Sequence, residues 1–134
     1  MNKGGIMREI KFRAWDKRFK IMQHRVGIDC YEDGSTGFYG DNCGRDTNEF
    51  ILMQYTGLKD KNGKEIYEED ILMEDQYRKY PRIVKWMKQW GRWMLHGYNP
   101  KLKKAYMIGI NHKLKESTVI GNIWETPELL KEDV

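Results

Sequence analysis

The sequence predicts a mainly β protein: a small barrel-like or sandwich domain of about seven short strands with a short C-terminal helix. Two observations lead to this class. Apolar and polar residues alternate in several short segments, and turn residues separate these segments at roughly 8 to 12 residue spacing. The chain has 134 residues, of which 40% are hydrophobic and 33% charged. This length suits one domain, and we expect it to cover residues 1–134.

The N-terminal part predicts a hairpin followed by a loop. Apolar and charged residues alternate over residues 9–14, as in a half-buried strand. Residues 16–18 are expected to form the turn, and a second strand runs through residues 19–26. Residues 33–48 are rich in Gly, Asp and Asn, a composition that predicts a flexible loop.

The middle of the chain carries the clearest turn. Residues 50–55 form a compact apolar run suited to a buried strand. Asn62-Gly63 predicts a type I′ turn, in which both residues take positive φ. Further strands are predicted at residues 71–73, 106–110 and 119–123, and a short helix capped by Thr126 with Pro127 at its first position.

Residues 80–98 fit two structures. Apolar residues from Ile83 to Trp93 recur at helical spacing and would line one helix face. Gly91, together with many β-branched and aromatic residues, indicates instead a hairpin with strands near 82–88 and 92–98. We expect the hairpin.

The formal net charge of +4 conceals a strong segregation. By position it divides into +6 over residues 1–28, -9 over 29–75, +11 over 76–115 and -4 over 116–134. The basic block contains no acidic residue. Such a block indicates either a polyanion-binding surface or a surface that pairs with the acidic block, within a subunit or between subunits.

Three segments, Met7 to Asp16, Leu52 to Leu72 and Val119 to Leu130, resemble the YopX family of phage and prophage proteins. The middle one, TGLKDKNGKEIYE followed by DI, is the most specific. The resemblance implies a β-rich fold, an origin in phage or prophage genomes and a function that is uncharacterised, with no catalytic residues to transfer. Relatives often carry Gly where this chain has Glu69, which questions the positive-φ turn that Gly would favour there.

Residues able to catalyse or to bind metal ions are scattered, so we expect no enzyme activity, no cofactor and no metal site. The consecutive acids Glu68, Glu69 and Asp70 are interpreted as a turn with solvated charges. The remaining candidates lack metal-ligand, GxSxG or close-cysteine spacing; they are His24, His96, His112, Ser35, Ser117, Cys30 and Cys43.

Two functions follow from these patterns. The first is a non-enzymatic, self-associating interaction module, a homo-oligomer that also has a host or phage protein as a partner. No apolar run can span a bilayer and no signal peptide is readable, so we expect a cytoplasmic protein of the bacterial host cell that makes no membrane contact.

The second function is single-stranded nucleic-acid or other polyanion binding by the basic, aromatic segment 77–93. A purely structural interpretation places Trp86 and Trp93 in the core, with the charged neighbours on the opposite face. The candidate contact residues are Arg78, Lys79, Arg82, Lys85, Lys88, Trp90 and Arg92.

Overall fold

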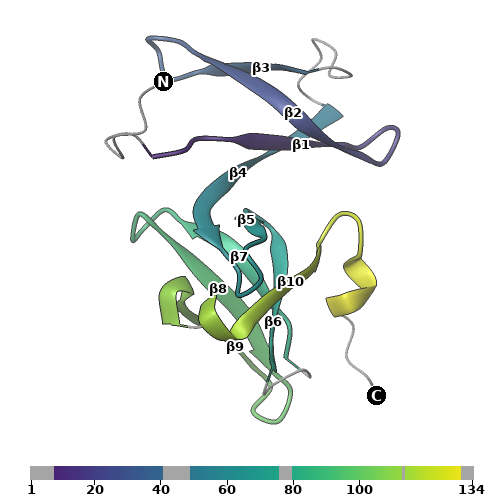
Figure 1. Cartoon of the computed structure of the whole chain (residues 1–134), viewed down its shortest axis with the longest axis vertical. Helices are drawn as coiled ribbons and strands as arrows, with labels where there is room; N and C mark the ends of the chain where they lie inside the picture. The colour runs from purple at the N-terminus through teal and green to yellow at the C-terminus, as the bar shows by residue number, and fades with distance from the viewer. Residues whose placement is uncertain (1–7, 41–48, 76–79, 113, 131–134) are drawn as a thin grey trace. The chain divides into compact units, whose positions relative to one another are not determined.

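The protein is built from two five-stranded antiparallel sheets, seen in a computed structural model (Figure 1). The structure describes residues 8–40, 49–75, 80–112 and 114–130. The chain divides into two compact units, residues 1–57 and residues 58–134, and the boundary lies within strand β4. The predicted mainly β class is confirmed.

The first sheet has the strand order β3-β2-β1-β4-β5. Its strands are β1 (Phe12–Asp16), β2 (Ile21–Cys30), β3 (Thr36–Gly40), β4 (Phe50–Lys59) and β5 (Glu65–Tyr67). The second sheet has the order β10-β6-β7-β8-β9. Its strands are β6 (Asp70–Glu74), β7 (Arg82–Met87), β8 (Arg92–Asn99), β9 (Lys104–Gly109) and β10 (Ser117–Asn122).

Strand β1 is buried on both faces, unlike the half-buried strand that alternation predicts. Arg13, Ala14, Trp15 and Asp16 are all buried. β1 is also an interior strand of its sheet, paired with β2 on one side and β4 on the other. The Asp16 carboxylate accepts a hydrogen bond from the Arg18 backbone N–H at 2.9 Å and so orders the following turn. The predicted N-terminal hairpin is confirmed.

The core of the second unit lies on one face of its sheet. Six buried side chains come together there, from β5, β6, β7, β8, β10 and the short 3-10 helix η3 (Ile110–His112). They are Ile66, Leu72, Val84, Leu95, Ile110 and Val119. Leu114, from the 3-10 helix η4 (Leu114–Glu116), packs against this cluster.

The structure differs from the predicted class in three details. The sheets are open, ending at β3 and β5 in one and at β10 and β9 in the other, so neither closes into a barrel. The described residues form ten strands and not about seven, since strands as short as β5 leave no readable periodicity. The C-terminal segment forms only the four-residue 3-10 helix η5 (Pro127–Leu130), closed by an i to i+3 bond from Leu129 N–H to Thr126 O.

The hairpin expected in residues 80–98 is confirmed, and the helical alternative is wrong. Strands β7 and β8 pair antiparallel, and Trp86 lies opposite Trp93. The Trp90 N–H donates to Met87 O at 3.0 Å across the turn, and Gly91 takes φ 59°. The helix-like spacing of the tryptophans therefore arises by chance, because Trp86 and Trp93 lie on two paired strands and Trp90 lies in the turn between them.

The Asn62-Gly63 turn is confirmed, but its type is not I′. Gly63 has φ 82°, whereas Asn62 is not among the residues with positive φ. Asp60 N–H donates to Lys64 O, which makes residues 61–63 a three-residue loop with Gly in the left-handed position. The buried carboxylate of Asp60, described below, selects this geometry.

Part of the segment predicted as a flexible loop is a strand. Thr36–Gly40 form β3, which pairs with β2 from Val26 to Cys30. Gly27 lies opposite Tyr39, whose ring covers it so closely that a Cβ at Gly27 would lie 2.4 Å from a ring carbon. Two of the glycines that suggested a loop, Gly37 and Gly40, therefore lie in a paired strand, and Gly34 lies in the turn before it; residues 41–48 lie outside the described residues.

Glu69 keeps the backbone shape that Gly would favour. Its φ is 70°, so the doubt that this substitution raised about the turn is answered: the positive φ is retained. Its N–H donates to Val84 O at 2.8 Å and its carbonyl accepts from Ile123 N–H at 3.1 Å. These bonds, to β7 and to the turn after β10, hold Glu69 in a conformation that costs an L-residue about 1 to 2 kcal/mol.

Glu69→Gly is expected to be more stable than Glu69→Ala by about 1 kcal/mol, because only the Ala variant retains the φ strain. Both variants lose the side chain, so the comparison isolates the backbone. Urea denaturation measures the difference. The matched pair Glu68→Gly and Glu68→Ala, at a neighbouring residue without positive φ, should show the opposite order, and equal stability of the two Glu69 variants would contradict the assignment.

Candidate binding surface

Asp60 joins the middle segment to the edge of the second sheet. One carboxylate oxygen accepts from the N–H groups of Asn62 at 2.8 Å and Lys64 at 2.9 Å. The other accepts from Val119 N–H at 2.9 Å. Burial disfavours the charged form, but these backbone bonds outweigh it and lower the pKa of Asp60 below its ordinary value of 3.8. Asp60 is therefore a structural anion.

Two of the three consecutive acids are also structural, so the expectation of solvated charges is wrong. Asp70 is buried, and its carboxylate accepts from Tyr67 N–H at 2.7 Å. The Glu69 carboxylate accepts from the indole N–H of Trp124. Glu68 and Glu69 lie in a turn as predicted and are half-buried, with Glu69 bonded to Trp124 in the C-terminal part of the chain, whereas Asp70 is the first residue of β6.

Arg82 belongs to a buried ion pair and not to a binding surface. Its guanidinium donates to Glu74 Oε2 at 2.7 Å and to the Tyr106 hydroxyl at 3.0 Å. The Glu74 side chain is fully buried and that of Arg82 is 11% exposed. The number of cations in the segment led to the wrong prediction that Arg82 is a contact residue. The sequence does not reveal which cation is paired with a buried carboxylate.

The turn between β7 and β8 presents an aromatic ring among cations. Trp90 is 56% exposed, and Lys88 and Arg92 on either side of it are exposed. Neither cation has an ion-pair partner among the residues that the structure describes. Of the other predicted contacts, Arg78 and Lys79 lie outside the described residues.

The remaining rings and cations fall on opposite faces of the hairpin. Trp86 packs edge-to-face on Trp93, with centroids 5.0 Å apart, and Trp93 packs against the core cluster. Because side chains alternate along a strand, Lys85 and Arg92 face the other way. The structure therefore does not bring all the predicted contact residues together on one surface. Of the predicted nucleic-acid site, only the turn around Trp90 still combines an exposed ring with exposed cations.

A second feature was missed in the sequence. The face of β7, β8 and β9 opposite the core carries three methionines, which the strand register places close together. The described C-terminal residues do not cover this face; they pack over Gly121 on β10. The sequence signal for this face is the alternation of side chains in paired strands, which places every second residue on the same side of the sheet. We call it the methionine face; its members are Ile83, Lys85, Met87, Arg92, Met94, His96, Tyr98, Ala105 and Met107.

All members of the methionine face are half-buried or exposed. Tyr98 is 46% exposed and Met107 is 38% exposed. Large apolar side chains that remain accessible in a group are typical of binding surfaces, and methionine adapts its shape to different partners. This face is the larger of the two candidate surfaces.

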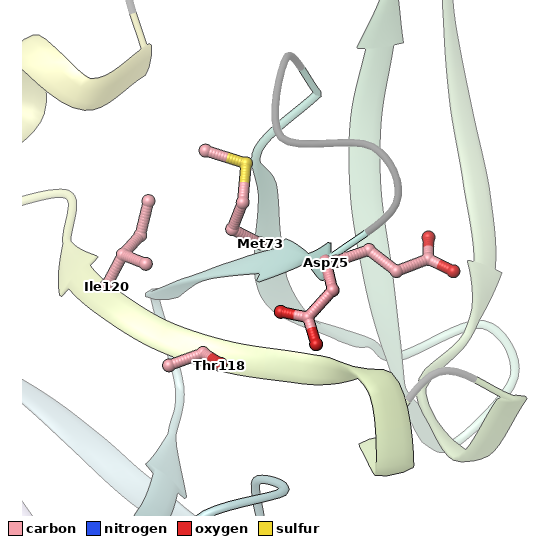
Figure 2. Close-up of a pocket in the computed structure, with 5 residues that line it drawn as sticks. Met73, Asp75, Thr118 and Ile120 are labelled. Atoms are coloured by element: carbon pink, nitrogen blue, oxygen red, sulfur yellow. The ribbon is translucent and has the colours of Figure 1, made fainter.

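A shallow hollow of about 310 Å³ lies where β6 meets β10. Figure 2 shows Thr118 and Ile120 on β10 and Met73 on β6 around it, with Asp75 just beyond β6. Both acids at the hollow are ion-paired: Asp75 with Lys61 and Glu74 with Arg82.

Within the described part of the chain, no three His, Cys, Asp or Glu side chains come together as a metal site would require. Cys30 is exposed and forms no disulfide with a described residue; Cys43 lies outside the described residues. None of the described helices has the length and apolar character needed to cross a membrane.

The comparison with protein families decides the assignment: a model described as YopX protein matches residues 11–131. The chain belongs to the YopX family. The family match spans both compact units and all ten strands. The middle segment that carries the YopX resemblance is the one whose acids, Asp60, Glu69 and Asp70, hold backbone N–H groups and the Trp124 indole, so its residues are accounted for by the fold.

Two solved structures are similar to this YopX chain. Protein EF1440 from Enterococcus faecalis is 25% identical with a TM-score of 0.62, covering 93% of this chain and 100% of its own. Protein yopX from Bacillus subtilis is 18% identical with a TM-score of 0.55, covering 96% of this chain and 100% of its own, which supports the fold. Among curated proteins none gives a significant match.

Proposed function

We propose that this YopX-family protein, encoded by a phage or prophage and acting in the host cytoplasm, functions by binding other macromolecules and not by catalysis. We further propose that it self-associates. The methionine face supports this function: it leaves Tyr98 and Met107 accessible beside the open edge strand β9. An open strand edge next to accessible apolar side chains favours pairing with another chain.

Light scattering tests self-association. We expect the purified protein at tens of micromolar to have a mass at least twice the 16.1 kDa of one chain, with dissociation on dilution. A mass of 16.1 kDa over the whole concentration range would contradict the proposal. Nuclease treatment beforehand ensures that a larger mass reflects protein alone.

Nucleic-acid binding at the turn around Trp90 is the second candidate, since an exposed ring between Lys88 and Arg92 suits one stacked base and its phosphates. Fluorescence anisotropy with a labelled single strand is expected to show weak binding that falls steeply as salt rises. Trp90→Ser should abolish it, and Lys101→Ser, at another turn, should not. No binding at low salt would remove this candidate.

A further inference from the structure

The methionine face carries positive charge that the described structure does not neutralise. Lys85 lies opposite Met94 in register, and Arg92 lies opposite Met87. Among the described residues neither cation has an ion pair, and residues 76–115 contain no acid. An apolar surface with cations and no anions is complementary to an apolar side chain flanked by acids.

The tip of the β2–β3 hairpin has that complementary chemistry. Tyr31 is 57% exposed, and the flanking acids Asp29, Glu32 and Asp33 are exposed as well. Asp29 and Glu32 have no ion pair with a described residue.

The hairpin tip is also ordered. Tyr31 N–H donates to Ser35 O at 3.0 Å, and Gly34 N–H donates to Tyr31 O at 3.0 Å. Bonds from the Ser35 hydroxyl and backbone N–H to the Asp33 carboxylate hold the turn closed and lower the pKa of Asp33 below its ordinary value of 3.8. A turn closed in this way presents Tyr31 and its acids at little entropic cost on binding.

We infer that the methionine face binds the acidic β2–β3 tip of a second copy of this chain. Tyr31 of one copy packs on Met87 and Met94 of the other, where sulfur–ring contacts are favourable, and its acids meet Lys85 and Arg92. The contact joins two different surfaces, so it propagates from copy to copy or closes in a ring or a two-fold pair. This inference identifies the interface of the self-association proposed above and rests on that proposal.

A charge-swap experiment tests the inference in the full chain. Lys85→Glu/Arg92→Glu makes the face acidic, and Asp29→Lys/Glu32→Lys makes the tip basic. Each double variant alone opposes like charges and is expected to self-associate at least about 100-fold more weakly than the wild type in light scattering. An equimolar mixture restores opposite charges at every contact and should recover association. Circular dichroism checks that each variant is folded.

Lys101→Glu/Lys103→Glu is the matched control, because both lysines are exposed on the turn between β8 and β9. It should associate like the wild type. If the face and tip variants associate as well as the wild type, or if the control is weakened as much as they are, the inference is overturned while self-association stands. A monomeric wild type would overturn both. Association that nuclease treatment removes would assign the face to nucleic acid and overturn the inference.

Discussion

Asp60→Ala is expected to destabilise the protein by about 3 to 4 kcal/mol, one of the two largest effects predicted here for a single side chain. The change removes three hydrogen bonds to a charged acceptor and leaves Val119 N–H, in a buried position, without its acceptor. Val119 lies on edge strand β10, so the loss also weakens the attachment of the 60–64 loop to the second sheet, leaving the backbone bond from Lys61 N–H to Ser117 O at 3.1 Å. Urea denaturation followed by tryptophan fluorescence measures it.

The same carboxylate makes the stability depend on pH in a definite direction. Since the folded-state pKa of Asp60 is lowered from 3.8, its contribution is fully present above the unfolded-state value and is lost as the pH falls through the lower folded-state value. Asp60→Asn should therefore be less sensitive to acid over this range. Asp33→Ala, which removes an exposed turn carboxylate, should change stability far less, and an equal loss would contradict the special role of Asp60.

Arg82→Met is expected to cost about 3 to 5 kcal/mol, because it takes the guanidinium away from a fully buried carboxylate at Glu74. The hydrogen bond to Tyr106 is lost as well. Thermal and urea unfolding measure the change. The double variant Arg82→Met/Glu74→Met should recover much of the stability, since it removes the buried charge together with its partner.

Lys85→Met is the matched control on the same strand. Lys85 lies on the methionine face without an ion pair among the described residues, so its loss should change stability by less than about 0.5 kcal/mol. If Arg82→Met lowered the free energy of unfolding as little as Lys85→Met, Arg82 would be a surface cation, as the sequence predicts. The two variants thus separate a structural cation from one available for binding.

The sequence was a sound guide wherever one strand or turn decides the outcome. The hairpin in residues 80–98 follows from Gly91 and strand-forming residues around it, and the turn at residues 61–63 follows from Asn62-Gly63. It was a poor guide to side-chain environment. The alternation in its strand assigns Arg13 to solvent, and the sequence assigns Asp70 to a solvated turn, yet both are buried, because residues of other strands pair with theirs.

The candidate binding surface, too, was predicted from the sequence only in part. The block of eleven cations and no acids over residues 76–115 is legible in the sequence, and it pointed to Lys88, Trp90 and Arg92, which are exposed. Removing Arg82 from that set and placing Met87, Met94 and Met107 on one face required the pairing of β7, β8 and β9.

The sequence by itself determined the family, the mainly β class, the main turns and the charge segregation, since these depend on local composition and on motifs read along the chain. The tertiary structure alone decided that the sheets are open, that Asp60, Glu69 and Asp70 are structural, and which cations remain accessible. The physical reason is that burial and register are set by contacts between strands far apart in the chain, such as Asp60 with Val119 and Glu74 with Arg82, and alternation within one strand does not encode its neighbours.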